Sequence, residues 1–387
     1  MSPPDAPRAL PGAALFTALL ALALVNAAAV RTNDFRVFHT AGARVLSGEA
    51  LYRSEDGQYP FKYAPVVGLL LAPVGALPLR TAKALWEVAS AAALFVFLRH
   101  SARLQAPAPS AASNGLAFAL LLPYLWHLFS LGQIDGFLLA AIALSDRWAD
   151  RHPLASGLLW ALALLTKPPY LVFLAVALLA RQWPRLLALA AGLAGGLLAP
   201  ALAWGWQRNL DTLRSWWTML GQSTPELLCA PSNQSLWAIA CRYLAPGVAA
   251  ALAAVAVGTL ALAAMTVRAA LKVPAGARDT VTCACLAATA LLSPLGWWTN
   301  FIALAPLFGG LAAESVRASE RWARTVAGAA VAVLAAVAVL TAELISRDAF
   351  VFWLNQRHYG LAALACTLAA LALRPAAYSQ PMTTSSM

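Results

Sequence analysis

Apolar segments recur along the chain from about residue 10 to residue 373, and this pattern constrains the fold more than any other feature. The residues are 61% hydrophobic and 11% charged. A soluble domain has about 25% charged residues, so a chain of this composition has too little polar surface to fold in water. The sequence therefore predicts an integral membrane protein built from α-helices.

We expect about ten to twelve membrane-spanning helices, although several apolar segments are shorter than the roughly 20 residues that a span needs. Short segments flanked by Pro and Gly suit a protein with a cavity at membrane depth, where irregular backbone must face protein or water. The first segment exceeds the core of about 7–15 residues in a cleaved signal peptide, so we expect it to be retained. The expected helices lie near residues 10–30, 82–99, 114–130, 132–147, 153–166, 168–180, 186–204, 244–267, 279–292, 300–313, 323–345 and 359–373.

Basic residues recur on every second connection between these segments. The formal net charge is +11, which in a soluble protein would suggest a nucleic-acid partner. In a membrane protein the same residues mark the cytoplasmic loops. We therefore expect no nucleic acid, and a multi-pass chain in the inner (plasma) membrane with both termini in the cytoplasm. The residues are Arg99, Arg103, Arg147, Arg151, Arg181, Arg185, Arg268, Lys272, Arg278, Arg317, Arg321 and Arg324.

Three polar stretches interrupt the pattern on the extracytoplasmic side, at residues 31–81, 205–243 and 293–300. Tryptophan clusters in the second stretch, and Trp is common at the level of the lipid headgroups, so we expect helices that lie on the membrane face there. Residues 1–374 are expected to form a single integral membrane domain. Residues 375–387 are expected to be a disordered cytoplasmic tail.

The five cysteines fall into two groups. Cys229 and Cys241 lie in the second polar stretch, and in an oxidising compartment they could form a disulfide. Two unpaired thiols are an equally good interpretation. Cys283, Cys285 and Cys366 lie in apolar segments, where Cys acts as a small buried hydrophobic residue. No spacing of Cys and His suggests a zinc site, and the sequence indicates no metal and no cofactor.

Short motifs follow one another in order from residue 31 to residue 86. The carboxylate of Asp34 stands first, aromatic residues follow, and an apolar stretch begins at Pro65. The stretch Pro65–Leu77 is too short to span a membrane, so we expect it to lie in the interface. The motif residues are Asp34, Phe35, Phe38, Ala41, Gly42, Leu46, Gly48, Leu51, Tyr52, Tyr63, Pro65, Leu77, Pro78, Leu85 and Trp86.

Later motifs continue the set. They are Gly132-Gln133-Ile134-Asp135, Lys167-Pro168-Pro169, Asn233-Gln234-Ser235-Leu236 followed by Arg242, and Leu292-Ser293-Pro294 followed by Trp297. In this order the motifs resemble glycosyltransferase family 87, also known as the DUF2029 group, of the GT-C superfamily. The resemblance implies a GT-C-type helical bundle with extracytoplasmic loops and interfacial helices. It also implies a mannosyl- or arabinofuranosyltransferase that uses a polyprenyl-phosphate sugar.

The chain departs from the family pattern at two places. Ala64 stands where the family has the first residue of a Pro-Pro pair. Thr299 and Asn300 stand where the family often has two histidines. The second change leaves open a different sugar, a different acceptor or a loss of activity.

Asp34 can be interpreted in two ways. Asp is a common N-cap, so the residue could only begin a helix. A glycosyl acceptor, however, needs a carboxylate to take the proton of its hydroxyl group, and the family resemblance favours this general base. Because the donor sugar is already bonded to phosphate, one base suffices and the displacement inverts the anomeric centre. Glycosidases normally need two carboxylates.

The leaving phosphate needs cationic partners, for which Lys62, Lys167 and Arg242 are the candidates. The Arg guanidinium can pair with two oxygens at once. Lys167 interrupts a long apolar run, and ionisable residues at membrane depth are usually functional. The alternative for each cation is a headgroup contact made by a side chain that snorkels to the surface.

Other polar residues of the motifs are candidates for binding the sugar or the acceptor. Amide side chains suit sugar hydroxyls but equally hold the backbone of turns. The carboxylate of Asp135 either caps the helix that starts near Gly136 or binds a sugar hydroxyl. The candidates are Gln133, Asp135, Asn233, Gln234, Trp297 and Asn300.

The sequence thus predicts an enzyme that transfers mannose, another hexose or a pentose from a polyprenyl-phosphate donor at the extracytoplasmic face. The expected acceptor is a lipid-linked or cell-envelope glycan. A transporter or flippase for lipid-linked sugars is the alternative, but the chain shows no repeat symmetry of the kind that many transporters have. A non-catalytic family member is a further alternative, given the replaced histidines.

Overall fold

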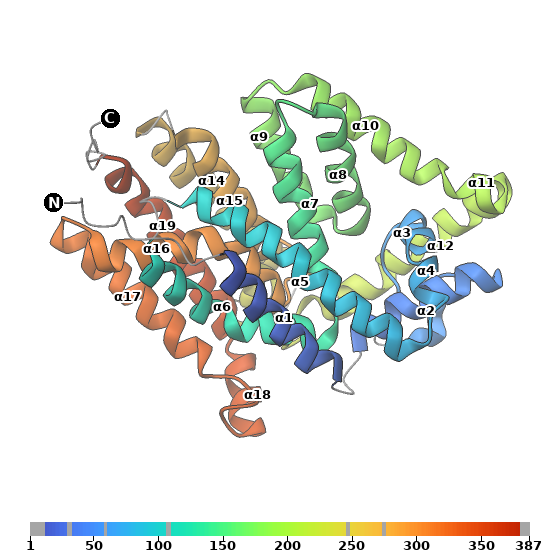
Figure 1. Cartoon of the computed structure of the whole chain (residues 1–387), viewed down its shortest axis with the longest axis horizontal. Helices are drawn as coiled ribbons and strands as arrows, with labels where there is room; N and C mark the ends of the chain where they lie inside the picture. The colour runs from blue at the N-terminus through green and yellow to red at the C-terminus, as the bar shows by residue number, and fades with distance from the viewer. Residues whose placement is uncertain are drawn as a thin grey trace. The chain divides into compact units, whose positions relative to one another are not determined.

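The computed structural model describes residues 12–28, 33–57, 60–105, 110–244, 248–272 and 276–379. Every regular element in these ranges is a helix, apart from an isolated β-bridge between Asn233 and Trp297 (Figure 1). The prediction of an all-α protein is therefore confirmed. Helices pair their own backbone groups, which is what a lipid environment requires.

Within the described ranges, six helices are long and apolar enough to cross a membrane. They are Leu79–Leu104, Ala111–Leu131, Trp183–Trp204, Ala249–Lys272, Trp298–Arg317 and Arg321–Ala338. Shorter apolar helices occupy Gly12–Ala28, Pro153–Thr166, Pro168–Leu179 and His358–Arg374. Three of these short helices coincide with segments that the sequence predicts to be shorter than a full span, whereas Gly12–Ala28 lies within the expected full-length segment at residues 10–30. The chain is a membrane protein.

The chain forms two compact units. The first, which we call the Asp34 unit, consists of Phe16–Phe97 and Leu125–Leu227. The second, which we call the Asn233 unit, consists of Leu98–Tyr124 and Leu228–Met387 together with Met1–Leu15, within the described ranges.

The Asp34 unit begins with most of α1 (Gly12–Ala28) and continues through short helices to α12. Its elements are α2 (Asn33–Ser47), the 3-10 helix η1 (Ser54–Asp56), α3 (Pro65–Leu70), α4 (Ala72–Gly75), most of α5 (Leu79–Leu104), the end of α6 (Ala111–Leu131), α7 (Asp135–Trp148), α8 (Pro153–Thr166), η2 (Pro168–Phe173), α9 (Leu174–Leu179), α10 (Trp183–Leu198), α11 (Pro200–Trp204) and α12 (Trp206–Leu228).

Glycines allow the helices of this unit to approach closely. A Cβ atom on Gly42 of α2 would lie 2.1 Å from the carbonyl oxygen of Leu71. A Cβ atom on Gly75 of α4 would lie 2.1 Å from the backbone nitrogen of Ala43. Only glycine fits at these two positions, so α2 is fixed against α4. This contact gives a physical reason for the Gly42 position of the motif set.

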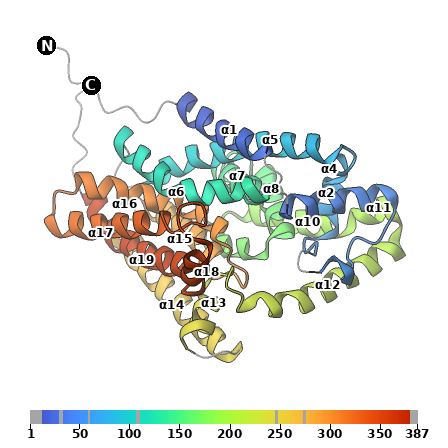
Figure 2. The ribbon, with the colours of Figure 1, turned by 90° about the horizontal axis from the view of Figure 1, so that it is seen from below.

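Helix α8 packs against α7 and α10. The buried ring of Trp160 lies 5.0 Å from the guanidinium carbon of Arg185 on α10, and its indole nitrogen donates to the carbonyl of Tyr170. The indole thus ties α8 to η2 and fixes the chain on both sides of Lys167. Helix α12 follows α11 directly and runs as one long helix in Figure 2.

The Asn233 unit is built mainly from long helices at the C-terminal end of the chain. It includes the end of α5 and the start of α6, and its later elements are α13 (Leu236–Tyr243), α14 (Val248–Lys272), α15 (Ala277–Leu291), the 3-10 helix η4 (Trp298–Leu304), α16 (Ala305–Arg317), α17 (Arg321–Ala338), α18 (Arg347–Asn355) and α19 (His358–Ser379). Helices α16 and α17 lie side by side in both views, and α19 packs against α17. The rings of Tyr124, Phe301, Phe308 and Tyr359 form an aromatic core.

The expected polar stretch 31–81 contains a helix, since α2 takes up 15 residues of it. Two other segments differ from the expected boundaries. Helix α18 was not expected, and none of its side chains is buried. The last helix runs to Ser379 instead of ending near residue 374, and the rest of the expected tail, residues 380–387, lies outside the described residues.

Candidate active site

Asp34 lies in the first turn of α2. Phe35 and Phe38 of the same helix are buried, and both rings pack against Trp86 of α5 with centroid distances of 5.7 and 5.3 Å. These contacts fix the rotation of α2 and leave the Asp34 side chain partly exposed. Because α2 begins at Asn33, Asp34 lies inside the helix and not before it. A negative charge in this turn interacts favourably with the helix dipole.

Gln133 holds the Asp34 carboxylate, since its Nε2 donates a hydrogen bond to Asp34 Oδ2. The preceding Gly132 has a φ of 68°, a conformation that favours glycine. A Cβ atom there would lie 2.6 Å from Cβ of Phe35. The indole nitrogen of Trp86 fixes the same turn by donating to the Gly132 carbonyl over 3.0 Å. Gly132 therefore lets the turn between α6 and α7 come close enough for Gln133 to reach α2.

Burial raises the pKa of the Asp34 carboxyl from 3.8 to about 6. The positive charge of Lys167 opposes this rise, and the negative charge of Asp135 adds to it. A carboxyl with a pKa near neutrality combines a large ionised fraction at neutral pH with a real affinity for a proton. That combination suits a general base.

Lys167 and Asp135 form an ion pair. The Lys167 ammonium lies 2.7 Å from Asp135 Oδ1 and 2.9 Å from Oδ2, and the two side chains are 18% and 4% exposed. Asp135 is the first residue of α7 and forms no capping hydrogen bond, so it binds a cation instead of capping the helix. Lys167 stands in extended backbone between α8 and η2. Its ammonium points at a partner inside the protein, whereas a snorkelling side chain would extend toward the headgroups.

Lys62 lies in the same unit, in the extended segment before α3. Its carbonyl accepts a hydrogen bond of 2.8 Å from the indole of Trp216 on α12. Burial lowers the pKa of the Lys62 ammonium, and the charge of Glu226 opposes the change. In the part of the chain that the structure describes, this ammonium forms no hydrogen bond or ion pair. Lys62 therefore remains available to bind an anion.

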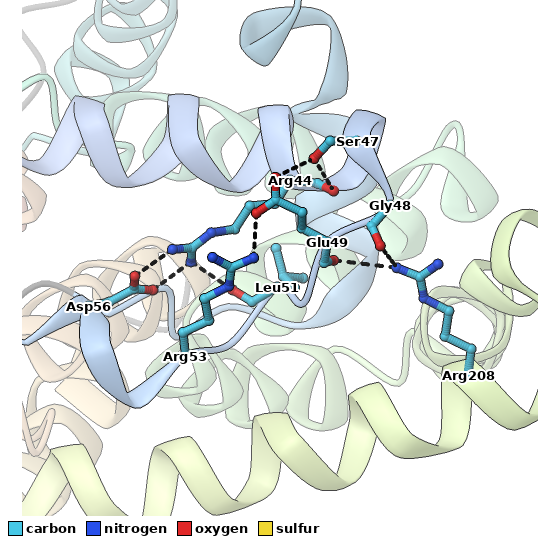
Figure 3. A network of polar contacts seen from close by, with 8 residues as sticks. All are labelled: Arg44, Ser47, Gly48, Glu49, Leu51, Arg53, Asp56 and Arg208. Carbon is cyan, nitrogen blue, oxygen red and sulfur yellow. Dashed lines mark hydrogen bonds and ion pairs between the residues drawn. The ribbon is translucent and has the colours of Figure 1, made fainter.

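The other basic residues near the end of α2 are engaged by the chain itself (Figure 3). Arg44 binds both oxygens of Asp56, at 2.6 and 2.5 Å. Arg208 of α12 donates to the carbonyl of Gly48 over 2.6 Å, and Arg53 pairs with Glu49. This network fixes the C-terminal end of α2, while Gln133 contacts its N-terminal end.

Asn233 and Gln234 lie in the Asn233 unit, and both side chains are fully buried. The amide nitrogen of Asn233 donates to the carbonyls of Leu228 and Pro294 at 2.8 and 2.7 Å. The amide nitrogen of Gln234 donates to the carbonyls of Pro231 and Leu354 at 2.8 and 3.0 Å. These are the contacts of residues that hold turns, which was one of the two interpretations left open by the sequence.

Three further candidates belong to the same unit. Arg242 is exposed and donates to the side-chain oxygen of Gln356 over 3.3 Å. Trp297 pairs with Asn233 through backbone and precedes η4. Asn300 is 9% exposed, and the fully buried Thr299 donates to its side-chain oxygen over 3.5 Å. The two residues that replace the histidines thus contact each other.

Cys229 and Cys241 form a disulfide with their Cα atoms 5.6 Å apart. The buried guanidinium of Arg357 holds the segment between the two cysteines in place, because it donates hydrogen bonds to the carbonyls of Cys229 and Ala238 at 2.9 and 3.3 Å. Arg357 belongs to none of the sequence motifs, so the motif analysis did not identify it. Among the described residues, Cys283, Cys285 and Cys366 are buried and form no disulfide.

The structure thus brings together Asp34, Gln133, Asp135 and Lys167 in one unit, with Lys62 on the segment before α3. It gives the site a half-buried carboxylate, an amide that holds this carboxylate, and an ion pair in the same unit. Among the described residues, no group of three His, Cys, Asp or Glu side chains could hold a metal ion. The Asp34–Gln133 contact was not predicted, and no local signal could have found it, because 99 positions separate the two residues.

Residues 61–295 match the family model of glycosyltransferase family 87, which is more than half of the chain. No curated protein sequence matches the chain.

Two solved structures resemble it as well. The crystal structure of ArnT from Cupriavidus metallidurans bound to undecaprenyl phosphate is 18% identical, with a TM-score of 0.37, and the match covers 94% of this chain and 77% of that one. The apo structure of the same ArnT is 16% identical, also with a TM-score of 0.37, and the match covers 95% and 77% of the two chains.

Proposed function

Since the chain belongs to glycosyltransferase family 87, we propose that it transfers a sugar from a polyprenyl monophosphate to a glycan acceptor, with Asp34 as the general base. The acceptor is a lipid-linked or cell-envelope glycan, and the sugar is mannose, another hexose or a pentose. The observation that carries the proposal is the partly exposed carboxylate of Asp34, held by Gln133 next to the Asp135–Lys167 ion pair.

The reaction is a single displacement at the anomeric carbon. The acceptor oxygen forms a bond to this carbon while its proton passes to Asp34. The bond from the anomeric carbon to the phosphate oxygen breaks, and its electron pair leaves with the polyprenyl phosphate. One carboxylate is enough because phosphate is a good leaving group, and a single displacement inverts the anomeric configuration.

Gln133 supports Asp34 in this scheme by occupying one oxygen of its carboxylate. The other oxygen, Oδ1, forms no hydrogen bond within the described residues and is the one that takes the proton. A base of this kind acts only if its orientation is fixed before the substrate arrives. The amide of Gln133 supplies that orientation without adding a charge that would lower the basicity of Asp34.

Lys167 stabilises the departing phosphate. Two of the three N–H groups of an ammonium suffice for the contacts with Asp135, at 2.7 and 2.9 Å, and the third is free for a phosphate oxygen. Lys62 is a second candidate in the same unit, and Arg242 is the candidate in the Asn233 unit. Positive charge at the leaving group is the expected means of stabilising its developing negative charge.

The active face is proposed to be extracytoplasmic. Helix α7 runs from Asp135 to Trp148 and α8 returns from Pro153 to Thr166, so Asp135 and Lys167 lie at the opposite end of this pair from Arg147 and Arg151. Basic connections mark the cytoplasmic side. The Cys229–Cys241 disulfide supports the same orientation for its segment, because disulfides persist in oxidising compartments.

The test is transfer by an Asp34→Asn variant in nanodiscs, with a polyprenyl-phosphate sugar as donor. A general base contributes about 10²- to 10⁴-fold to a rate, so the variant should lose activity by that order. Asp211→Asn is the matched control, because Asp211 lies on the surface of α12, 56% exposed, in an ion pair with Arg214. Full transfer by Asp34→Asn would refute the assignment, and transport without transfer by the native chain would favour a transporter.

A further inference from the structure

We propose that Tyr63 is a further catalytic residue, whose hydroxyl donates a hydrogen bond in the transition state to the phosphate oxygen that leaves with the polyprenyl chain. This inference rests on the proposed function and assigns a role to a motif residue that the mechanism has not used.

Hydrogen bonds fix the segment around Tyr63 from three sides. The hydroxyl of Tyr52 donates to the Tyr63 carbonyl over 2.6 Å. The indole of Trp216 donates to the Lys62 carbonyl over 2.8 Å. The backbone nitrogen of Ala64 donates to the carbonyl of Leu165 over 3.0 Å. Each bond joins the segment to a different part of the Asp34 unit, so the position of Tyr63 is set by the fold.

The same segment contacts both α2, which carries Asp34, and the end of α8, which precedes Lys167. Its ring lies 5.6 Å from the ring of Phe38, which is one helical turn after Asp34 on α2. The Ala64–Leu165 bond joins the segment to α8 just two residues before Lys167. The ring of Phe61 packs edge-on against Tyr63 at 5.4 Å and restricts its orientation. Tyr63 therefore lies next to the helix that carries Asp34, and the charges of Asp34 and Asp135 both act on its hydroxyl.

The hydroxyl of Tyr63 is a permanent donor. Burial raises the pKa of this hydroxyl well above 10, and the charges of Asp135 and Asp34 raise it further, so it stays protonated at every physiological pH. The side chain is partly exposed. Within the described residues its hydroxyl has no hydrogen-bond partner, which leaves the proton for a ligand.

A neutral donor suits the leaving oxygen in this setting. As the bond between the anomeric carbon and the phosphate oxygen breaks, negative charge grows on that oxygen, close to the carboxylates of Asp34 and Asp135. A hydroxyl that donates there stabilises the charge in the transition state more than in the ground state. Tyr63 keeps its proton throughout, since Asp34 takes the proton released by the acceptor.

The experiment compares the native chain with Tyr63→Phe and Tyr52→Phe in nanodiscs. The experiment uses two donors that carry the same sugar. The first is the natural polyprenyl monophosphate. The second is an analogue with fluorine next to the phosphate, which makes that phosphate a better leaving group. Removing a donor to a developing oxyanion costs on the order of 100-fold in kcat, so Tyr63→Phe should lose about that much with the natural donor. The loss should shrink with the fluorinated donor, and KM should change little.

Tyr52→Phe is the control for position. It loosens the same segment but keeps the Tyr63 hydroxyl, so any loss of kcat should be equal for the two donors. An equal loss for both donors with Tyr63→Phe would show that the residue is only structural and would overturn the inference. Thermal unfolding of each variant identifies a folding defect.

A variant with fluorotyrosine at position 63 provides a further test, because fluorotyrosine is a stronger hydrogen-bond donor of the same shape. This variant should transfer the sugar at least as fast as the native chain. Slower transfer would count against the inference.

The outcomes separate this inference from the proposed function. If the native chain transfers, Asp34→Asn does not, and Tyr63→Phe matches the native kcat, only the role of Tyr63 is lost. If the native chain fails to transfer from either donor, the proposed function and this inference are both overturned.

Discussion

Asp34→Asn should make the protein more stable while it removes catalysis. The folded chain raises the pKa of Asp34 from 3.8 to about 6. Such a shift corresponds to about 3 kcal/mol between the two protonation states, because one pKa unit is worth about 1.4 kcal/mol. The charged carboxylate is therefore costly in the folded state at neutral pH. The Asn side chain has nearly the same shape, keeps an oxygen for the Gln133 amide and avoids the cost.

The pH dependence has a definite sign. A raised pKa means that the folded state binds the proton more tightly than the unfolded state. Below pH 3.8 the carboxyl is protonated in both states, so it causes no loss of stability. The loss of stability grows as the pH rises from 3.8 to about 6 and is complete above that pH. Relative to the native chain, Asp34→Asn should gain up to about 3 kcal/mol at pH 7.5 and nothing near pH 3.8.

The assay is unfolding in detergent by heat or denaturant at a series of pH values between these limits, with Asp211→Asn as the surface control. The midpoint of Asp34→Asn should exceed that of the native chain at pH 7.5, and the two should converge as the pH falls. Equal midpoints at every pH, or a variant that is less stable at pH 7.5, would refute the argument that burial penalises this carboxylate.

The ion pair beside the base gives the remaining predictions. Lys167→Met should lower stability by about 3–5 kcal/mol, because it leaves the Asp135 carboxylate buried without a partner. It should also raise the pKa of Asp34 further, since the Lys167 charge opposes the rise, so transfer should begin at a higher pH. Combining Lys167→Met with Asp135→Leu should recover most of the stability, as measured by thermal unfolding, but not the transfer. An Lys167→Met variant with native stability and native transfer would contradict both statements.

The membrane helices could be predicted because each one follows from local sequence. The segment 153–166 was predicted at the bounds that α8 has, since Pro153 starts an apolar run and Lys167-Pro168 ends it. Proline fits the first turn of a helix and stops the one before it. Helix α18 was missed because its nine residues mix charged, aromatic and aliphatic side chains and none of them is buried.

The contacts within the site could be predicted only in part. Asp135 and Lys167 are opposite charges in apolar surroundings, which is a general signal for a pair across the 32 positions between them. The hydrogen bond between Gln133 and Asp34 depends on the close approach at Gly132, and side-chain patterns do not reveal such an approach. For Asn233 the sequence leaves sugar binding or a turn open, and the buried side chain forms hydrogen bonds with four backbone groups, as a residue that holds a turn does.

The pH dependence of kcat/KM is the most direct test of Asp34 as the base. In the native chain, kcat/KM for the polyprenyl-phosphate sugar should fall about tenfold per pH unit below an apparent pKa near 6, because this ratio reports the free enzyme and only the ionised carboxylate can accept the proton. The residual transfer of Asp34→Asn should not show this fall at low pH. A native kcat/KM that stays constant down to pH 4.5, or the same fall at low pH in Asp34→Asn, would contradict the account.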